Sequence, residues 1–167
     1  MSLQFWVSFP IGSAKEQQAH LRASLALAGI SDGVIARTDR GKPYLISHPS
    51  VHLSVSHSGD YWVCAIGDKP VGIDLQRHTD VRRMALARRF FHPDETTYLQ
   101  ETDCADFFRI WAAKESFVKC TGTGIAGQFA AFSVIRNGGI AAPDGYTLTE
   151  FPFLPGYTLF LCEQNHS

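Results

Sequence analysis

Two acidic residues stand out because each belongs to a segment that is otherwise largely apolar. Glu115 falls within the apolar arc of a helix predicted for residues 104–120, and Asp74 follows the apolar start of a strand predicted for residues 71–75. A carboxylate that faces inward costs several kcal/mol unless its charge is compensated. Within the protein, Glu115 can pair with Lys119 one helical turn later, and Asp74 can accept hydrogen bonds from turn backbone. The other reading is that both acids bind a cation.

An amide oxygen accompanies the strand carboxylate. Gln76 projects from the same face of the strand as Asp74, two residues further on. Two carboxylates and an amide oxygen form an oxygen-rich ligand set of the kind that Mg²⁺ prefers. The three residues therefore form a candidate magnesium site, with Glu115 as the ligand from the helix.

A histidine flanked by hydroxyl groups could bind phosphate. Residues 54–58 read Ser-Val-Ser-His-Ser and end a strand that alternates apolar and polar side chains. Adjacent strand residues point to opposite faces, so Ser56 and His57 do not form a nucleophile–base pair, and the G-x-S-x-G elbow of hydrolases is missing. Phosphate binding through the hydroxyls, the imidazole and free turn amides fits better. A turn histidine that only hydrogen-bonds backbone is the alternative.

The elements that position these residues indicate an α+β fold. Strands are predicted for residues 3–9, 51–57, 61–66 and 71–75, and helices for residues 15–28, 81–91, 104–120 and from Pro93 onward. Gly29 and Gly122 are the expected helix stops. Read as a meander, the strands from 51 to 75 bring His57 and Asp74 to the same edge of one sheet. In the helix of residues 104–120, Ser116 and Cys120 fall on the polar side.

Composition restricts the classes of function. The 167 residues are 45% apolar, with 12 Phe and 3 Trp, which suits one domain with a real core. The net charge of -1 gives no overall attraction for nucleic acid or anionic membrane. The four cysteines lack C-x-x-C spacing, so no zinc site is expected. Without a signal-like or membrane-spanning segment, a soluble cytoplasmic protein is predicted.

In order, these motifs resemble those of the Sfp-type 4′-phosphopantetheinyl transferases. The resemblance runs from about Arg40 to Glu163 and is carried by three blocks: Gly41-Lys42-Pro43-Tyr44 with residues 51–59; Val71-Gly72-Ile73-Asp74-Leu75; and Arg89-Phe90-Phe91 with Ile110-Trp111-Ala112-Ala113-Lys114-Glu115-Ser116-Phe117-Val118-Lys119 and Gly122-Thr123-Gly124-Ile125. The pattern W-x-x-K-E-S-x-x-K in order with G-I-D is highly specific.

The resemblance implies a role for each candidate residue. Asp74 and Glu115, with Gln76 as a third candidate, would hold Mg²⁺ at the pyrophosphate of coenzyme A. The donor's phosphates would be contacted by Lys42, Ser56, His57 and Lys119. Asp74, Glu115 and Lys119 would form the catalytic centre, with Glu115, directly or through a water, as the base.

The resemblance also implies the reaction and the architecture. A serine of an apo acyl or peptidyl carrier protein would attack the β-phosphate of coenzyme A and release 3′,5′-ADP, in fatty-acid, polyketide or nonribosomal-peptide synthesis. The family fold is a pseudo-dimer of two similar α+β halves. It implies a donor-binding half at residues 1–69, a half with the metal site and long helix at residues 70–167, and a monomer.

The sequence departs from the family pattern in two places. Many Sfp-type members have glutamate where this chain has Gln76, and a basic segment that usually precedes the helix of residues 15–28 is missing. Arg22 or Arg37 could replace its cations. Two other functions therefore stay open: a degenerate protein that binds coenzyme A or carrier proteins without turnover, and a metal-dependent phosphohydrolase acting on a nucleotide.

Overall fold

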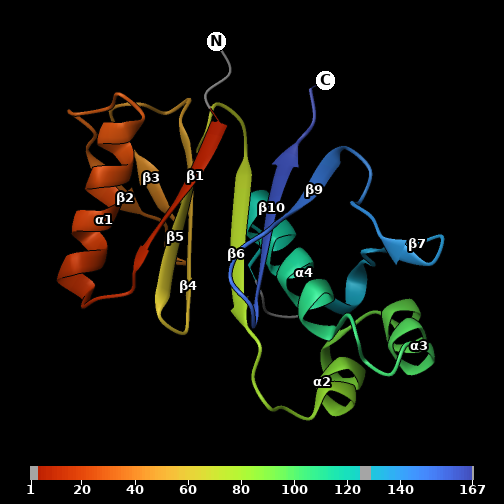
Figure 1. Cartoon of the computed structure of the whole chain (residues 1–167). Coiled ribbons are helices and arrows are strands. Elements are labelled where there is room, and N and C mark those ends of the chain that lie inside the picture. The colour runs from red at the N-terminus through yellow and green to blue at the C-terminus, as the bar shows by residue number, and fades with distance from the viewer. Residues whose placement is uncertain (1–3, 125–128, 167) are drawn as a thin grey trace.

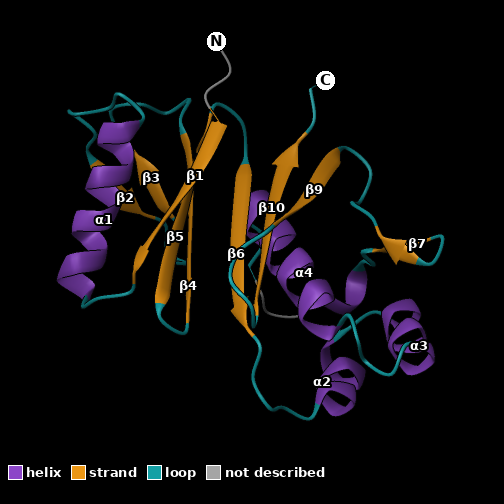
Figure 2. Ribbon diagram, viewed as in Figure 1, coloured by secondary structure: helices purple, strands orange, loops and turns teal. Residues whose placement is uncertain are grey.

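The computed structural model describes residues 4–124 and 129–166, and it has the mixed α+β architecture that the sequence predicts (Figure 1; Figure 2). Leu3 and Ile125 therefore lie outside the described residues. The helices are α1 (Ala14–Leu27), α2 (Arg83–Phe90), α3 (Pro93–Glu101) and α4 (Phe107–Thr121), with a short 3₁₀ turn at Phe129–Ala131. None of the helices in the described ranges is long and apolar enough to cross a membrane.

The first half of the chain forms a three-stranded antiparallel sheet with one helix on its face. The strand order is β1 (Gln4–Pro10), β5 (Tyr61–Gly67) and β4 (His52–Ser58). Ser13 and Glu16 form a capping box at the start of α1, and Gly29 adopts the left-handed conformation just after its end. Leu21 and Leu25 of α1 pack into a buried apolar cluster on this sheet. The small hairpin β2 (Ile35–Arg37) and β3 (Pro43–Leu45) lies between α1 and β4 in the sequence.

The second half forms another three-stranded antiparallel sheet, and here the predicted meander is wrong. The strand β6 (Val71–Arg77) pairs with β10 (Tyr157–Gln164) and not with β5, and β9 (Tyr146–Phe151) completes the order β6-β10-β9. A tight turn after β5 directs the chain into the new sheet, and the partner of β6 comes from the far end of the sequence. Another hairpin, β7 (Ile135–Arg136) and β8 (Gly139–Ile140), lies outside this sheet.

The two sheets meet along the strands β4 and β6, which lie side by side in Figure 1. A buried cluster joins the halves on one side of this junction: Val63, Ala65, Val71, Ile73, Leu75, Leu159 and Leu161. On the other side, α4 covers β6 and β10, and the helices α2 and α3 pack beyond it (Figure 2). The long helix is therefore covered by protein on two sides.

Burial on two sides explains where the helix prediction failed. Ser116 and Cys120 were expected on a polar face, yet both are buried. The Ser116 hydroxyl bonds to the carbonyl of Ala113, and the Cys120 thiol lies 3.2 Å from the carbonyl of Pro70. Small polar residues that satisfy their own hydrogen bonds can thus line a helix–sheet contact. The predicted stop at Gly122 is confirmed, with the residue in the left-handed conformation.

Candidate active site

Asp74 lies in the middle of β6 rather than at its end, because the strand continues to Arg77. Its side chain is 3% exposed. Oδ1 accepts hydrogen bonds from Lys119 Nζ at 2.7 Å and Ser56 Oγ at 3.1 Å, and Oδ2 accepts one from Gln76 Nε2 at 2.7 Å. The partners are side chains from three elements, so the interpretation as a turn aspartate bonded to local backbone is wrong.

The residue two positions before this aspartate has to be glycine because α4 touches the strand there. A Cβ atom on Gly72 would overlap the carbonyl oxygen of Ser116 and lie 2.5 Å from the backbone nitrogen of Cys120. Both are backbone atoms of α4, which cannot move aside independently of the helix. The absence of a side chain at Gly72 thus lets α4 approach β6 closely enough to bring Glu115 and Lys119 to Asp74.

Lys119 extends from α4 to the strand. Its Nζ contacts Asp74 Oδ1 and lies 3.2 Å from the carbonyl oxygen of Ile73. Among the described residues, Lys119 forms its ion pair with Asp74. The alternative, a pair with Glu115 one helical turn earlier, is not found. An ammonium group in this place neutralises one of the two carboxylates at the junction of the halves.

Glu115 is the second carboxylate, and its surroundings disfavour its charge. The side chain is only 7% exposed. Burial, aided by the nearby charge of Asp74 and opposed by Lys119, raises the pKa of Glu115 to about 7. A carboxyl group poised near neutrality beside another carboxylate can exchange a proton or take up a cation at physiological pH.

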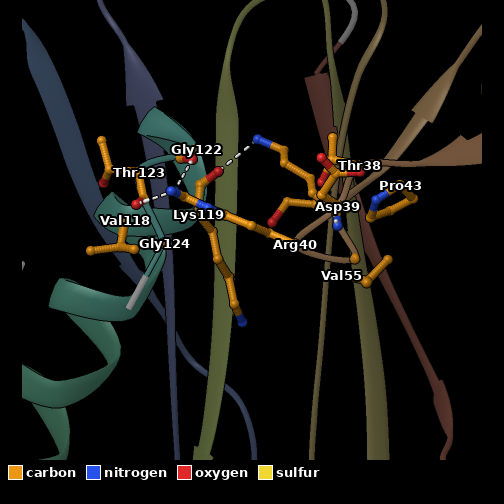
Figure 3. Close-up of a pocket in the computed structure, with 13 residues that line it drawn as sticks. Thr38, Asp39, Arg40, Pro43, Val55, Val118, Lys119, Gly122, Thr123 and Gly124 are labelled. Carbon is orange, nitrogen blue, oxygen red and sulfur yellow. Dashed lines mark hydrogen bonds between the residues drawn. The ribbon is translucent and has the colours of Figure 1, made fainter. Parts of the chain in front are cut away.

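A pocket of about 750 Å³ opens beside Lys119, between the loop that joins β2 to β3 and the carboxyl end of α4. It is lined by residues 38–43, 54–55, 118–119 and 122–124. Figure 3 shows Arg40 crossing this space, and its guanidinium donates to the carbonyl oxygens of Gly122 and Thr123. Lys42 Nζ donates to the carbonyl of Lys119 at 2.6 Å. Three cationic side chains thus line one pocket of a size suited to a small ligand.

Burial lowers the pKa of Lys42 from its ordinary value. The Lys42 ammonium group is half-buried and bonds to the neutral carbonyl of Lys119, so an anion entering the pocket would add a favourable charge partner. Arg40 is exposed and lies at the negative end of the α4 dipole, where its guanidinium bonds to two backbone carbonyls. The three cationic residues outnumber the one acidic lining residue, Asp39, so the charge balance of the pocket suits an anionic ligand.

Of the other predicted site residues, two contact Asp74 and one does not. Ser56 contacts Asp74. Gln76 directs its amide nitrogen toward the same carboxylate, because an ionised carboxylate only accepts hydrogen bonds. His57 is exposed, and its imidazole has no hydrogen bond or ion pair with any residue that the structure describes. Within residues 4–124 and 129–166, no three His, Cys, Asp or Glu side chains cluster in a way that could hold a metal ion. A cation here would rest on two carboxylates, with an amide in the place of a third.

Sequence reasoning missed one neighbouring ion pair. Lys114 is completely buried and contacts both oxygens of the equally buried Glu95, each at 2.9 Å. Its Nζ also donates to the carbonyl of Phe132 at 2.5 Å and lies 4.0 Å from that ring's centroid. The position of Lys114 in the apolar arc of α4 was the available signal, but the partner lies in another helix. This pair fixes α4 against α3 and so supports the position of Glu115.

Comparison with known proteins places this arrangement in a family. The sequence pattern of the 4′-phosphopantetheinyl transferase superfamily matches residues 70–152. The chain is 40% identical over 129 residues to a 4′-phosphopantetheinyl transferase of Bacillus subtilis, covering 71% of this chain and 55% of the relative. It is 31% identical over 143 residues to 4′-phosphopantetheinyl transferase Sfp of Bacillus subtilis strain 168, covering 79% and 63%.

A vertebrate relative extends the likeness beyond bacteria. The chain is 33% identical over 110 residues to the L-aminoadipate-semialdehyde dehydrogenase-phosphopantetheinyl transferase of Xenopus laevis, covering 55% of this chain and 36% of the relative. The alignments thus span between about a third and two thirds of the length of these three relatives. The superfamily pattern includes Asp74, Gly72 and the whole of α4. On this combined evidence the chain belongs to the 4′-phosphopantetheinyl transferase superfamily, among its Sfp-type members.

Proposed function

We propose that this protein transfers the 4′-phosphopantetheine arm of coenzyme A to a serine of an apo acyl or peptidyl carrier protein. The observation that carries the proposal is the meeting of Asp74, Glu115 and Lys119 beside a pocket with two further cations. Phosphoryl-group transfer needs charge stabilisation and positioning more than covalent catalysis. Carboxylates for a metal next to ammonium and guanidinium groups for phosphates meet that need.

The donor set suits Mg²⁺, which is the cofactor that we propose. Mg²⁺ takes one or two protein carboxylates and fills its other positions with water and substrate phosphate oxygens. Asp74 and Glu115 would hold it, and a bound cation would offset the burial and the repulsion by Asp74 that raise the pKa of Glu115. When bound, Mg²⁺ neutralises the pyrophosphate and stabilises charge that develops on the leaving group. We propose Gln76 as a weaker third ligand, through its amide oxygen.

The protein's own residues would bind the donor and move the proton. Of the phosphate contacts that the family resemblance implies, we propose Lys42, Lys119 and His57, and Arg40 adds a cation inside the pocket. The serine hydroxyl oxygen attacks the β-phosphorus, the bond from that phosphorus to the bridging oxygen breaks, and 3′,5′-ADP leaves with the electron pair. Glu115 is the proposed base that takes the serine proton, directly or through a water.

The architecture supports the pseudo-dimer that we propose for the fold. When only the three strands of each sheet are counted in chain order, both sheets have the order first, third, second, and each half carries a helix after its first strand. The division into residues 1–69 and 70–167 follows the tight turn before β6. We further propose a cytoplasmic monomer whose donor lies between the halves.

One observation favours a second candidate, a degenerate protein that binds coenzyme A without turnover. Gln76 donates to Asp74 where a third carboxylate would strengthen a metal site. A single assay separates the two functions and also tests the phosphohydrolase. Release of 3′,5′-ADP from coenzyme A is followed by chromatography with and without an apo carrier protein. Transfer predicts release that needs both the carrier and Mg²⁺.

The other outcomes are equally informative. Release without a carrier would identify a phosphohydrolase, and coenzyme A binding without release under any condition would identify the degenerate binder. Asp74→Ala should abolish release while the circular dichroism spectrum stays native. A near-normal rate in this variant would remove Asp74 from the proposed metal site.

A further inference from the structure

The strand β4 joins the second half of the protein through serines at every second position. The hydroxyl oxygens of these serines accept hydrogen bonds from successive outward backbone N–H groups of β6: Ser54 from Ile73 at 3.0 Å, Ser56 from Leu75 at 3.2 Å and Ser58 from Arg77 at 2.9 Å. Each pair is separated by 19 residues, so the two strands run parallel and in register. We call these three hydrogen bonds the serine ladder.

The serine ladder solves a problem that the fold creates. The strands β4 and β6 are edge strands of separate sheets, and their facing backbone groups would be left without partners at a buried junction. Ser54 and Ser56 are buried, and Ser58 is half-buried. Side-chain hydroxyls thus take the place of a backbone ladder between the halves.

Ser56 differs from the other two serines because its hydroxyl also reaches the candidate metal site. Its oxygen accepts from Leu75, and its single proton is donated to Asp74 Oδ1. A serine hydroxyl has one proton to donate. With that proton committed to Asp74, Ser56 has none left for a phosphate oxygen of the donor.

The carboxylate needs such a partner. The last side-chain torsion of aspartate has a broad energy minimum, so burial alone does not fix the direction of the two oxygens. Lys119 and Gln76 also contact Asp74, but the Lys119 side chain is 28% exposed and Gln76 is half-buried. Ser56 is the buried contact of the three, and it is fixed at its other side by the β6 backbone.

We propose that Ser56 is a positioning residue that orients Asp74 for metal binding, rather than a ligand of the donor's phosphates. The serine ladder thereby makes the direction of a metal-binding carboxylate depend on the junction of the two halves. The inference rests on the proposed Mg²⁺ site. Groups that orient a metal ligand from behind change metal affinity by about 10- to 100-fold when they are removed.

The test compares Ser56→Ala with Ser54→Ala, which removes the neighbouring rung but no contact to Asp74. Calorimetry measures the affinity for Mg²⁺, or for Mn²⁺ as a probe, without coenzyme A. It then measures the affinity for coenzyme A in excess chelator. We expect Ser56→Ala to weaken metal binding about tenfold or more and to leave metal-free coenzyme A binding unchanged. Ser54→Ala should keep the metal affinity of the unmodified protein, and Ser56→Thr should restore it.

Unfolding in urea shows whether the free energy of unfolding falls equally in the two alanine variants, since each leaves one N–H of β6 without its acceptor. If either does not fold, Ser56→Cys and Ser54→Cys repeat the comparison with a thiol, which is of similar size and a weak donor.

Three results would overturn the inference: loss of metal-free coenzyme A affinity in Ser56→Ala at constant metal affinity, equal loss of metal affinity in both variants, or a wild-type protein that binds no divalent cation. A wild-type protein that binds the metal but does not modify a carrier would contradict the transfer proposal alone. The metal titrations of the variants would then still decide the role of Ser56.

Discussion

Replacing Glu115 by glutamine should make the metal-free protein more stable at alkaline pH. Burial and the charge of Asp74 raise the pKa of Glu115 from 4.5 to about 7, and the side chain is nearly inaccessible to solvent. At 1.36 kcal/mol for each pKa unit, the ionised carboxylate costs the folded protein about 3 kcal/mol. Glu115→Gln keeps the size of the side chain and removes the charge.

The sign follows from proton binding. Between pH 4.5 and 7 the folded protein retains a proton on Glu115 that the unfolded chain releases. This contribution to the stability of the wild type therefore falls as the pH rises through this window and is constant above it. The variant lacks this loss. It should match the wild type near pH 4.5 and exceed its free energy of unfolding by about 3 kcal/mol at pH 8.

Urea unfolding at several pH values, without divalent cations, measures the difference. Other groups with shifted pKa, such as the imidazole of His78, are common to both proteins and cancel. Glu101→Gln, at an exposed position in α3, is the matched control and should change little. Added Mg²⁺ should stabilise the wild type at pH 8 and have much less effect on Glu115→Gln. A variant that is equally or less stable than the wild type at pH 8 would refute the reasoning, because Glu115 would then carry its charge without penalty.

Three further substitutions test the support of the site. Gly72→Ala should lower the free energy of unfolding, measured in urea, by about 3 kcal/mol and should weaken metal binding, because α4 must move away from β6. The control is Gly139→Ala, where a Cβ meets no atom within 4 Å. Equal stability of the two variants would contradict the close approach of α4. Lys114→Met should lower the free energy of unfolding by about 3–5 kcal/mol, measured by heat or urea, since Glu95 keeps a buried charge. The double variant with Glu95→Gln should regain part of this stability, and no gain would show that the charge is not the cause. Gln76→Glu should tighten Mg²⁺ binding in calorimetry, and an unchanged titration would show that position 76 does not touch the cation.

The elements of this fold were largely predictable from local sequence signals. The stop at Gly29, the proline that begins α3 and the stop at Gly122 all lie where short-range rules place them. Local signals did not predict which strands pair with each other in the sheets. The strand β6 could pair with β5 next to it or with β10 from the far end of the chain, and the apolar pattern of β6 suits both.

The candidate site shows the same difference between local signals, which the sequence reveals, and long-range contacts, which it does not. Asp74 and Glu115 attract notice as acids in apolar segments, but their convergence depends on the approach of α4 to β6 at Gly72. The alternating serines of β4 form a pattern that is visible in the sequence, yet their acceptance of N–H groups from β6 depends on a junction that no local pattern specifies. Spacing predicts which face a residue occupies, and contacts between distant segments require the assembled fold.

Intact-mass spectrometry of apo carrier proteins tests the central claim most directly. A panel of fatty-acid, polyketide and peptide carriers is incubated with the purified protein, coenzyme A and Mg²⁺, and each carrier is weighed. The proposed function predicts that at least one carrier gains the mass of one phosphopantetheine, and that this gain disappears with Asp74→Ala or with a chelator. A panel that stays unmodified while coenzyme A binding is confirmed by calorimetry would contradict transfer.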